Sequence, residues 1–276
     1  MATGIDHVVI AVNDLDQAIA DYTSAGFTVS PGGEHTNAVT KNALIAFAAG
    51  GYFELIAWNK PDDTVWSKRL QAGEGFIDFA LRTADLDAEV FRLREEGVDV
   101  PDPVPGGRKR PDGEMVEWQT MRLDPERYPS LPFYCHSTND RALRVPFGDA
   151  TLHANGAIGI DTIFIGVSDL DQAAADYGLV AGIAFEEVPH TQPEANRWQS
   201  FKVGTATITL FESEDKDSDL ARSITRRGEV PVEVTLNSTM SEGSAIDHNL
   251  THGAKLAILA RAATIEVPEW EQDVDA

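Results

Sequence analysis

Residues 4–22 read GIDHVVIAVNDLDQAIADY, and residues 159–177 repeat them closely as GIDTIFIGVSDLDQAAADY. In both copies a run rich in β-branched residues comes first, and the apolar positions then change to helical spacing. Each copy is therefore predicted to be a strand followed by a helix. The copies differ at one position that matters for metal chemistry, because His7 in the first is replaced by Thr162 in the second.

The repeat extends beyond these two stretches and organises the whole chain. Extended segments at 27–31, 42–50 and 52–58 follow the first helix and complete a β-α-β-β-β unit. A second unit begins at residue 75 and a third at residue 159, whereas a fourth, beginning near residue 230, has too few apolar residues in helical register to form a helix. The fourth unit is interpreted as degenerate.

The pattern predicts an α+β fold in which paired modules form cupped mixed sheets. The expected bounds are domains at 1–140 and 141–276, with helices at 14–25, 85–97 and 169–181 on the outer sheet faces. Alternation along the first strand places His7, Val9 and Ala11 toward the cup, and Val8, Ile10 and Val12 toward the helices.

The register between the units follows from counting. His7, Asp78 and Thr162 each precede an Asp-Leu-Asp stretch by seven residues, so they occupy one position on the first strand of their units. The stretch suggests an acidic pair for a metal, but its place before a helix favours an N-cap, with the second Asp beside the positive end of the helix.

The composition limits the kinds of partner that the protein is expected to bind. A formal charge of −23 over 276 residues argues against binding to nucleic acid or to anionic membranes, which clustered Lys and Arg would have to attract. The acidity fits a salt-adapted surface and equally an ordinary acidic protein.

No apolar run reaches the roughly 18 residues of a membrane span, so a cytoplasmic protein is expected. The single cysteine, Cys135, excludes an internal disulfide framework and is read as buried. The sequence leaves open whether the protein forms a homodimer.

Several of these stretches resemble the vicinal oxygen chelate superfamily, and within it the glyoxalase-like proteins, the group of glyoxalases, bleomycin resistance proteins and extradiol dioxygenases. The resemblance rests on GIDHVVIAVNDLDQAIADY, YFELIAW, FALRTADLDA, PVPGGRKRPDGE and LPFYCHS, and covers 4–137 well and 157–213 more weakly. It implies that metal ligands come from the first and fourth strands of two partnered modules.

The resemblance implies four ligand positions in the first module pair. These are His7 and Glu54 from the first module and Asp78 and His136 from the second, with Tyr134 as an alternative to His136. Two histidines with one or two carboxylates suit a divalent ion such as Fe, Mn, Ni, Co or Zn. In the second half the corresponding residues are Thr162, Thr209 and, if the register extends to the fourth unit, Glu233, so no second metal site is expected there.

Other polar and aromatic residues are weaker candidates. Arg108 and Arg110 lie in a Gly/Pro-bounded stretch that either clamps a substrate anion or forms a solvated turn. Trp118 and Tyr134 are candidates for lining the cup, and an aromatic at strand spacing is as readily a core residue. His35 and His190, each followed by Thr, are interpreted as loop-capping residues.

Two functions follow from this interpretation. The first is a metal-dependent lyase, isomerase or dioxygenase, in which the ion chelates adjacent oxygens of a small substrate and Glu54 moves a proton. The second is a metal-free protein that encloses a small molecule and so confers resistance. The sequence leaves both open, because one fold supports many activities.

Overall fold

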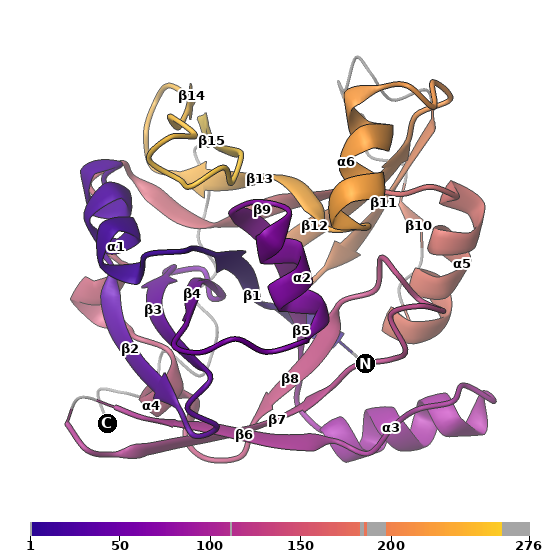
Figure 1. Ribbon diagram of the computed structural model, residues 1–276, viewed down its shortest axis with the longest axis horizontal. Helices are drawn as coiled ribbons and strands as arrows, with labels where there is room; N and C mark the ends of the chain where they lie inside the picture. The colour runs from indigo at the N-terminus through magenta and orange to yellow at the C-terminus, as the bar shows by residue number, and fades with distance from the viewer. Residues whose placement is uncertain (1, 111, 183–184, 187–196, 261–276) are drawn as a thin grey trace.

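The computed structural model describes residues 2–110, 112–182, 185–186 and 197–260 as two β-sheets with helices on their outer faces (Figure 1). The elements of the first half are β1 (Ala2–Ala11), α1 (Leu15–Ser24), β2 (Ser30–His35), β3 (Thr40–Ala46), β4 (Tyr52–Trp58), α2 (Val65–Gln71), β5 (Gly75–Thr83), α3 (Leu86–Glu95), β6 (Val104–Lys109), β7 (Met115–Met121), β8 (Phe133–Ser137) and α4 (Arg141–Arg144). Those of the second half are a 3-10 turn (Gly148–Thr151), β9 (Ala157–Gly166), α5 (Leu170–Ala181), β10 (Phe185–Glu186), β11 (Arg197–Val203), β12 (Ala206–Glu212), α6 (Asp219–Arg227), β13 (Pro231–Ser238), β14 (Ser244–Ala245) and β15 (Leu256–Ala260).

The three repeated helices begin where the sequence predicts. Asp14, Asp85 and Asp169 are the N-cap residues of α1, α3 and α5, and each side chain accepts a hydrogen bond from a backbone N–H of the first turn. The second Asp of each stretch lies in the first turn, beside the positive end of the helix dipole. The Asp-Leu-Asp stretches are therefore helix starts, as expected, and the α+β class is confirmed.

The first eight strands form a closed barrel in the order β1-β4-β3-β2-β6-β7-β8-β5. Each module contributes four strands, and β1 pairs with β4 in parallel and with β5 in antiparallel orientation. Contacts between β2 and β6 close the other side of the barrel. The expected cup is thus closed, and its interior is reached by side chains from both modules.

Alternation along β1 separates the two sides of the barrel wall. Val8, Ile10 and Val12 belong to the main hydrophobic core under the helices. Val9 and Ala11 belong to a smaller cluster that includes Phe133 and Cys135, and His7 lines a cavity. This is the arrangement that the strand period of two predicts.

The second sheet has the order β10-β11-β12-β9-β13-β15-β14, and one hydrophobic core runs through both halves. Buried tyrosine hydroxyls connect the halves, since Tyr22 donates to the carbonyl of Thr251 and Tyr177 donates to that of Ser130. The barrel ends at Ser137 and the second sheet begins at Ala157. The division of the chain into domains at 1–140 and 141–276 stays a prediction.

Several features depart from the sequence interpretation. Helices α2 and α6 and the short helix α4 were not expected. Part of the stretch read as a Gly/Pro-bounded loop is strand β6, because its backbone pairs with both β2 and β7. Between β13 and β15 the described residues contain no helix, in agreement with a degenerate fourth module. Among the described residues, no helix is long and apolar enough to cross a membrane.

Candidate functional site

A cavity of about 490 Å³ lies inside the barrel. Its lining combines titratable groups with aromatic and aliphatic side chains. The residues that the following paragraphs use are His7, His35, Asn42, Tyr52, Glu54, Trp58, Trp66, Arg108, Trp118, Arg122, Phe133, Cys135 and Arg144. Most of them come from the inward faces of β3, β4, β7 and β8.

Asp6 fixes the orientation of His7. The Asp6 carboxylate is fully buried and accepts two hydrogen bonds of 2.8 Å from Arg144. Burial alone would raise the pKa of Asp6, but the guanidinium of Arg144, with that of Arg141, holds this pKa well below its usual value. An ionised carboxylate only accepts hydrogen bonds, so Nδ1 of His7 donates to it at 2.7 Å. The other nitrogen of His7, Nε2, faces Glu54.

Glu54 lies between two histidines. Its Oε2 is 3.6 Å from Nε2 of His7, and its Oε1 is 3.6 Å from Nε2 of His35. Asn42 donates from Nδ2 to Oε1 of Glu54 at 2.6 Å. Nδ1 of His35 is 2.6 Å from the hydroxyl of Thr40, and burial is the main cause that lowers the pKa of His35. His35 is therefore a neutral base at neutral pH.

The donor set of His7 and Glu54 fits a divalent metal ion. Imidazole nitrogen and carboxylate oxygen are common ligands for such ions, and a hydrogen bond from the far nitrogen of the ring to a carboxylate is the usual support for a ligating histidine. The ring of His7 is also held by stacking on Tyr52 at a centroid distance of 4.7 Å and by the edge of Phe133 at 5.4 Å. The two donor atoms are thus positioned before any ion arrives.

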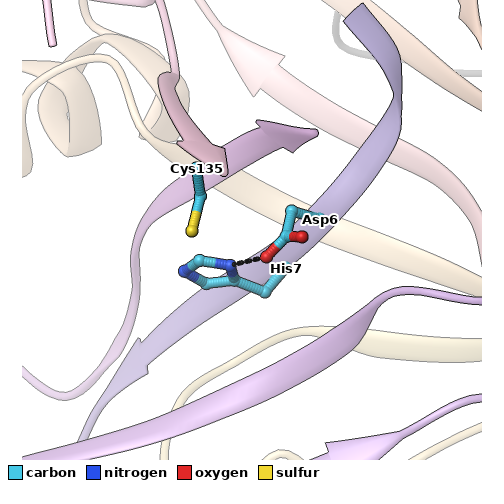
Figure 2. Close-up of side chains that lie close together, drawn as sticks. All are labelled: Asp6, His7 and Cys135. Atoms are coloured by element: carbon cyan, nitrogen blue, oxygen red, sulfur yellow. Dashed lines mark hydrogen bonds and ion pairs between the residues drawn. The ribbon is translucent and has the colours of Figure 1, made fainter. Parts of the chain in front are cut away.

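Asp6, His7 and Cys135 form a second group by distance (Figure 2). One ligand atom from each lies within 4.8 Å of the others, the only such cluster of His, Cys, Asp or Glu within the described ranges. Both oxygens of Asp6 are already bonded to Arg144, and a second cation beside that guanidinium would be repelled. Burial raises the pKa of the Cys135 thiol to about 12, so it stays protonated. We assign to Asp6 the orientation of His7.

Asp78 is committed to other partners. It lies beside Val9 in the register of β1 and β5, which is the inward position expected from the repeat. Its Oδ2 accepts a 2.6 Å hydrogen bond from Nε1 of Trp66 and a hydrogen bond from Arg122, and Arg69 lies 3.5 Å away. With these partners its oxygens are not directed at His7 and Glu54.

The structure does not bring His136 to the other candidates. In the parallel pairing of β5 with β8, Ala80 lies opposite Phe133, just as Val9 on β1 lies opposite Glu54. Phe133 therefore holds the position that matches Glu54, three residues before the one expected. His136 does not line the barrel cavity; it lines a second cavity of about 810 Å³, to which Cys135 and Arg144 also contribute.

The two faces of β8 explain the other placements on this strand. Phe133 and Cys135 line the barrel cavity. Tyr134 points away from it and donates its hydroxyl to the carbonyl of Val180 at 2.7 Å, so it joins the two halves of the chain. Nδ1 of His136 faces the carbonyl of Thr83 at 3.1 Å.

The remaining sequence candidates divide between the two cavities. Arg108 is buried in the barrel wall and donates to the carbonyls of Gly32 and Arg144, so it is not part of a solvated turn. Trp118 lines the barrel cavity and packs edge-on against His35 at 5.7 Å. Arg110 pairs with Asp112 and lines the second cavity, as His136 does.

Sequence reasoning missed several groups at this site. Asn42, Trp66, Arg122 and Arg144 carried no motif, and His35 was interpreted as a loop residue. Asn42 lies on β3, the strand next to that of Glu54, and His35 lies on β2, one strand further, so a full alternation analysis of the second and third strands was the signal that could have found them. His190 lies outside the described residues.

In the second half the same positions hold no comparable set. Thr162 lies opposite Thr207 as His7 lies opposite Tyr52, and Thr209 therefore matches Glu54. The hydroxyl of Thr162 donates to Asp161, and Glu233 forms an ion pair with Lys255. Hydroxyl side chains are poor ligands for a divalent transition metal.

Comparisons with known proteins agree with this fold. Residues 5–180 match the family model described as a glyoxalase-like domain. A hypothetical protein from Staphylococcus aureus superposes with a TM-score of 0.72 at 15% identity, over 92% of this chain and 98% of that one. A mutant of 4-hydroxymandelate synthase from Streptomyces coelicolor gives a TM-score of 0.56 at 12% identity, over 86% and 72%. At these identities the structures show a shared fold.

A search among curated protein sequences gave no match. The family match covers more than half of the chain and includes β1, β4 and their partners around the cavity. The chain therefore belongs to the glyoxalase-like domain family and has the paired-module fold of the vicinal oxygen chelate superfamily.

Proposed function

We propose that this protein is a metal-dependent enzyme that acts on a small oxygen-bearing molecule inside the barrel, with His7 and Glu54 holding a divalent ion. The observation that supports the proposal is the 3.6 Å separation of Nε2 of His7 from Oε2 of Glu54. The Nδ1 atom of His7 is bonded to Asp6, so Nε2, which faces Glu54, is the ring nitrogen left to bind an ion. A cation between the two groups satisfies both.

The bound ion would act as a Lewis acid that polarises oxygen atoms of the substrate. The protein supplies the other requirements. Asn42 holds one oxygen of Glu54 in place, and His35 lies beside the same oxygen as a neutral base that can take up a proton. Trp58, Trp66 and Trp118 line the cavity and reduce the access of water.

Metal binding to chelator-stripped protein tests this proposal. Titration calorimetry with Mn²⁺, Co²⁺, Ni²⁺ and Zn²⁺, and with Fe²⁺ under anaerobic conditions, should give one site per chain. His7→Ala and Glu54→Gln should abolish that site because each removes a ligand atom. His136→Ala is the matched control, since His136 does not line the barrel cavity, and it should bind the ion as the wild type does. Equal loss in His136→Ala would contradict the assignment.

Lyase, isomerase and dioxygenase chemistry share this arrangement, and the identity of the ion discriminates among them. Iron that changes oxidation state with substrate and oxygen would favour a dioxygenase, whereas activity with Zn²⁺ or Mg²⁺ would favour a lyase or an isomerase. The expected reaction is proton transfer next to a chelated oxygen, because both His35 and Glu54 are bases at that point.

A metal-free binding protein is the second candidate. It is favoured by the second module, where Phe133 and the arginine-bound Asp78 occupy the two positions that would complete a larger ligand set. In that case no ion should bind in the titration. Small organic ligands should then bind as tightly to chelator-treated protein as to untreated protein.

A further inference from the structure

The barrel cavity contrasts with the rest of the molecule in its charge. The chain carries a formal charge of −23, yet three arginines, Arg108, Arg122 and Arg144, line this cavity. An anion repelled by the surface would find a local positive potential only where such groups are concentrated. A ligand anion needs an arginine whose N–H donors are not all bonded within the protein.

Arg108 and Arg144 are occupied by the protein itself. Arg108 donates to the backbone carbonyls of Gly32 and Arg144. Arg144 donates to Asp6, Tyr52 and Ser137, and its side chain is only 4% exposed. These two guanidinium groups hold the barrel wall together.

Arg122 differs from them in two ways. Its side chain is 25% exposed, and the only hydrogen bond that its guanidinium makes to the described residues goes to Oδ2 of Asp78. The same carboxylate also has Arg69 at 3.5 Å, and it accepts from Nε1 of Trp66. Two guanidinium groups therefore share one carboxylate, which leaves about one positive charge uncompensated within this group of three side chains.

Aromatic side chains surround this charge. The guanidinium carbon of Arg122 lies 4.9 Å from the centroid of the Phe133 ring, and the ring of Trp66 lies 5.7 Å from that of Phe133. The edge of Phe133 also faces His7 at 5.4 Å, so this ring is in contact with both the arginine and the proposed metal ligand. A flat apolar group that packs on these rings would place an attached anion beside Arg122.

We propose that the barrel cavity takes an aromatic carboxylic acid, with its carboxylate bound by Arg122 and its ring packed against Phe133 and Trp66. The inference rests on the proposed function in that it names the substrate class of the same cavity. The recognition itself needs only side chains of the protein. The second module, which offers Asp78 and Phe133 in place of further metal ligands, thus serves to hold the acid.

Calorimetric titration of metal-free protein with phenylacetate and with phenylacetamide tests the proposal. The two probes share size and ring and differ in charge, so the comparison isolates the carboxylate. We expect phenylacetate to bind at least about tenfold more tightly than the amide, since a charge-assisted hydrogen-bond pair contributes that much. Absence of phenylacetate binding, or equal affinity for both probes, would overturn the proposal.

Arg122→Met is the decisive variant. It should fold, because Asp78 keeps Arg69, Trp66 and the backbone N–H of Phe79 as partners. It should lose the preference for the acid, whereas Arg122→Lys should retain part of it. Arg127→Met is the matched control, since Arg127 carries the same charge and contacts Tyr128 away from the cavity lining. A preference that survives in Arg122→Met or is lost in Arg127→Met would refute the role of Arg122.

The test separates this inference from the metal proposal. The preference for the acid is measured in metal-free protein, so it does not depend on the ion, and Arg122→Met should bind the ion as the wild type does. If no ion binds but the acid preference depends on Arg122, only the metal proposal fails. If the ion binds and the acid preference does not appear, only the present inference fails.

Discussion

Replacing Asp6 by Asn should destabilise the protein more than almost any other single polar change in the barrel. Asp6 has no exposed surface, and it accepts hydrogen bonds of 2.8 Å from both Nη1 and Nη2 of Arg144 and one of 2.7 Å from His7. Removing one partner of a buried ion pair typically costs about 3–5 kcal/mol, because the other charge stays buried without compensation. Asn keeps one acceptor oxygen, so we expect about 3 kcal/mol.

The assay is urea unfolding of the wild type, Asp6→Asn, Arg144→Met and the double variant at neutral pH. The cost of the double variant should be clearly less than the sum of the two single costs, because Arg144→Met removes the guanidinium that Asp6→Asn leaves unpaired. A cost of less than about 1 kcal/mol for Asp6→Asn, or strict additivity of the two, would refute the reasoning.

The pH dependence of the same comparison follows from the depressed pKa of Asp6. A carboxyl whose pKa is lower in the folded protein stabilises the fold above its unfolded pKa, and this stabilisation is lost as the pH falls through the folded value. The difference in unfolding free energy between wild type and Asp6→Asn should therefore be largest above pH 3.8, the ordinary pKa of this carboxyl group, and should shrink as the pH falls below it. Asp6→Asn should also weaken the hydrogen bond that orients His7, and the affinity for the metal ion should fall roughly tenfold to a hundredfold.

Three further results are expected. Molar KCl should raise the melting temperature, because screening reduces the repulsion within a chain of charge −23; an unchanged or lower value would make the acidity incidental. Cys135, which is 2% exposed and has a pKa raised to about 12 by burial, should react with thiol reagents at pH 8 only after unfolding, and rapid labelling of native protein would contradict its placement. Thr162→Ala should leave metal binding unchanged in calorimetry, and any loss of the ion would mean that the second half contributes to the site.

Much of the fold could be predicted because the repeat carries its own register. The Asp caps at 14, 85 and 169 locate three helices, and alternation along the first strand places His7 inside the barrel. The pairing of β1 with β4 brings Glu54 to the same cavity, as the family resemblance implied. The helix starts and the side of His7 depend on local periodicity, which a sequence displays directly.

The rest depends on contacts between distant segments. The register of β8 against β5 decides whether Phe133 or His136 reaches the cavity, and the irregular segment between β7 and β8 gives no local signal for it. Arg144 follows the barrel strands, yet it bonds Asp6, 138 residues earlier in the chain. Likewise Arg122 and Trp66 meet Asp78 only in the folded barrel.

The most direct test of the central claim is the metal content of protein purified without chelators and without a histidine-rich tag. The account predicts one divalent ion per chain in the wild type and in Thr162→Ala, and none in His7→Ala, which should keep the fold of the wild type. Two ions per chain, or retention of the ion after His7→Ala, would contradict the assignment of the site to His7 and Glu54. Wild-type protein that contains no ion and takes none up would leave the barrel as a metal-free binding site.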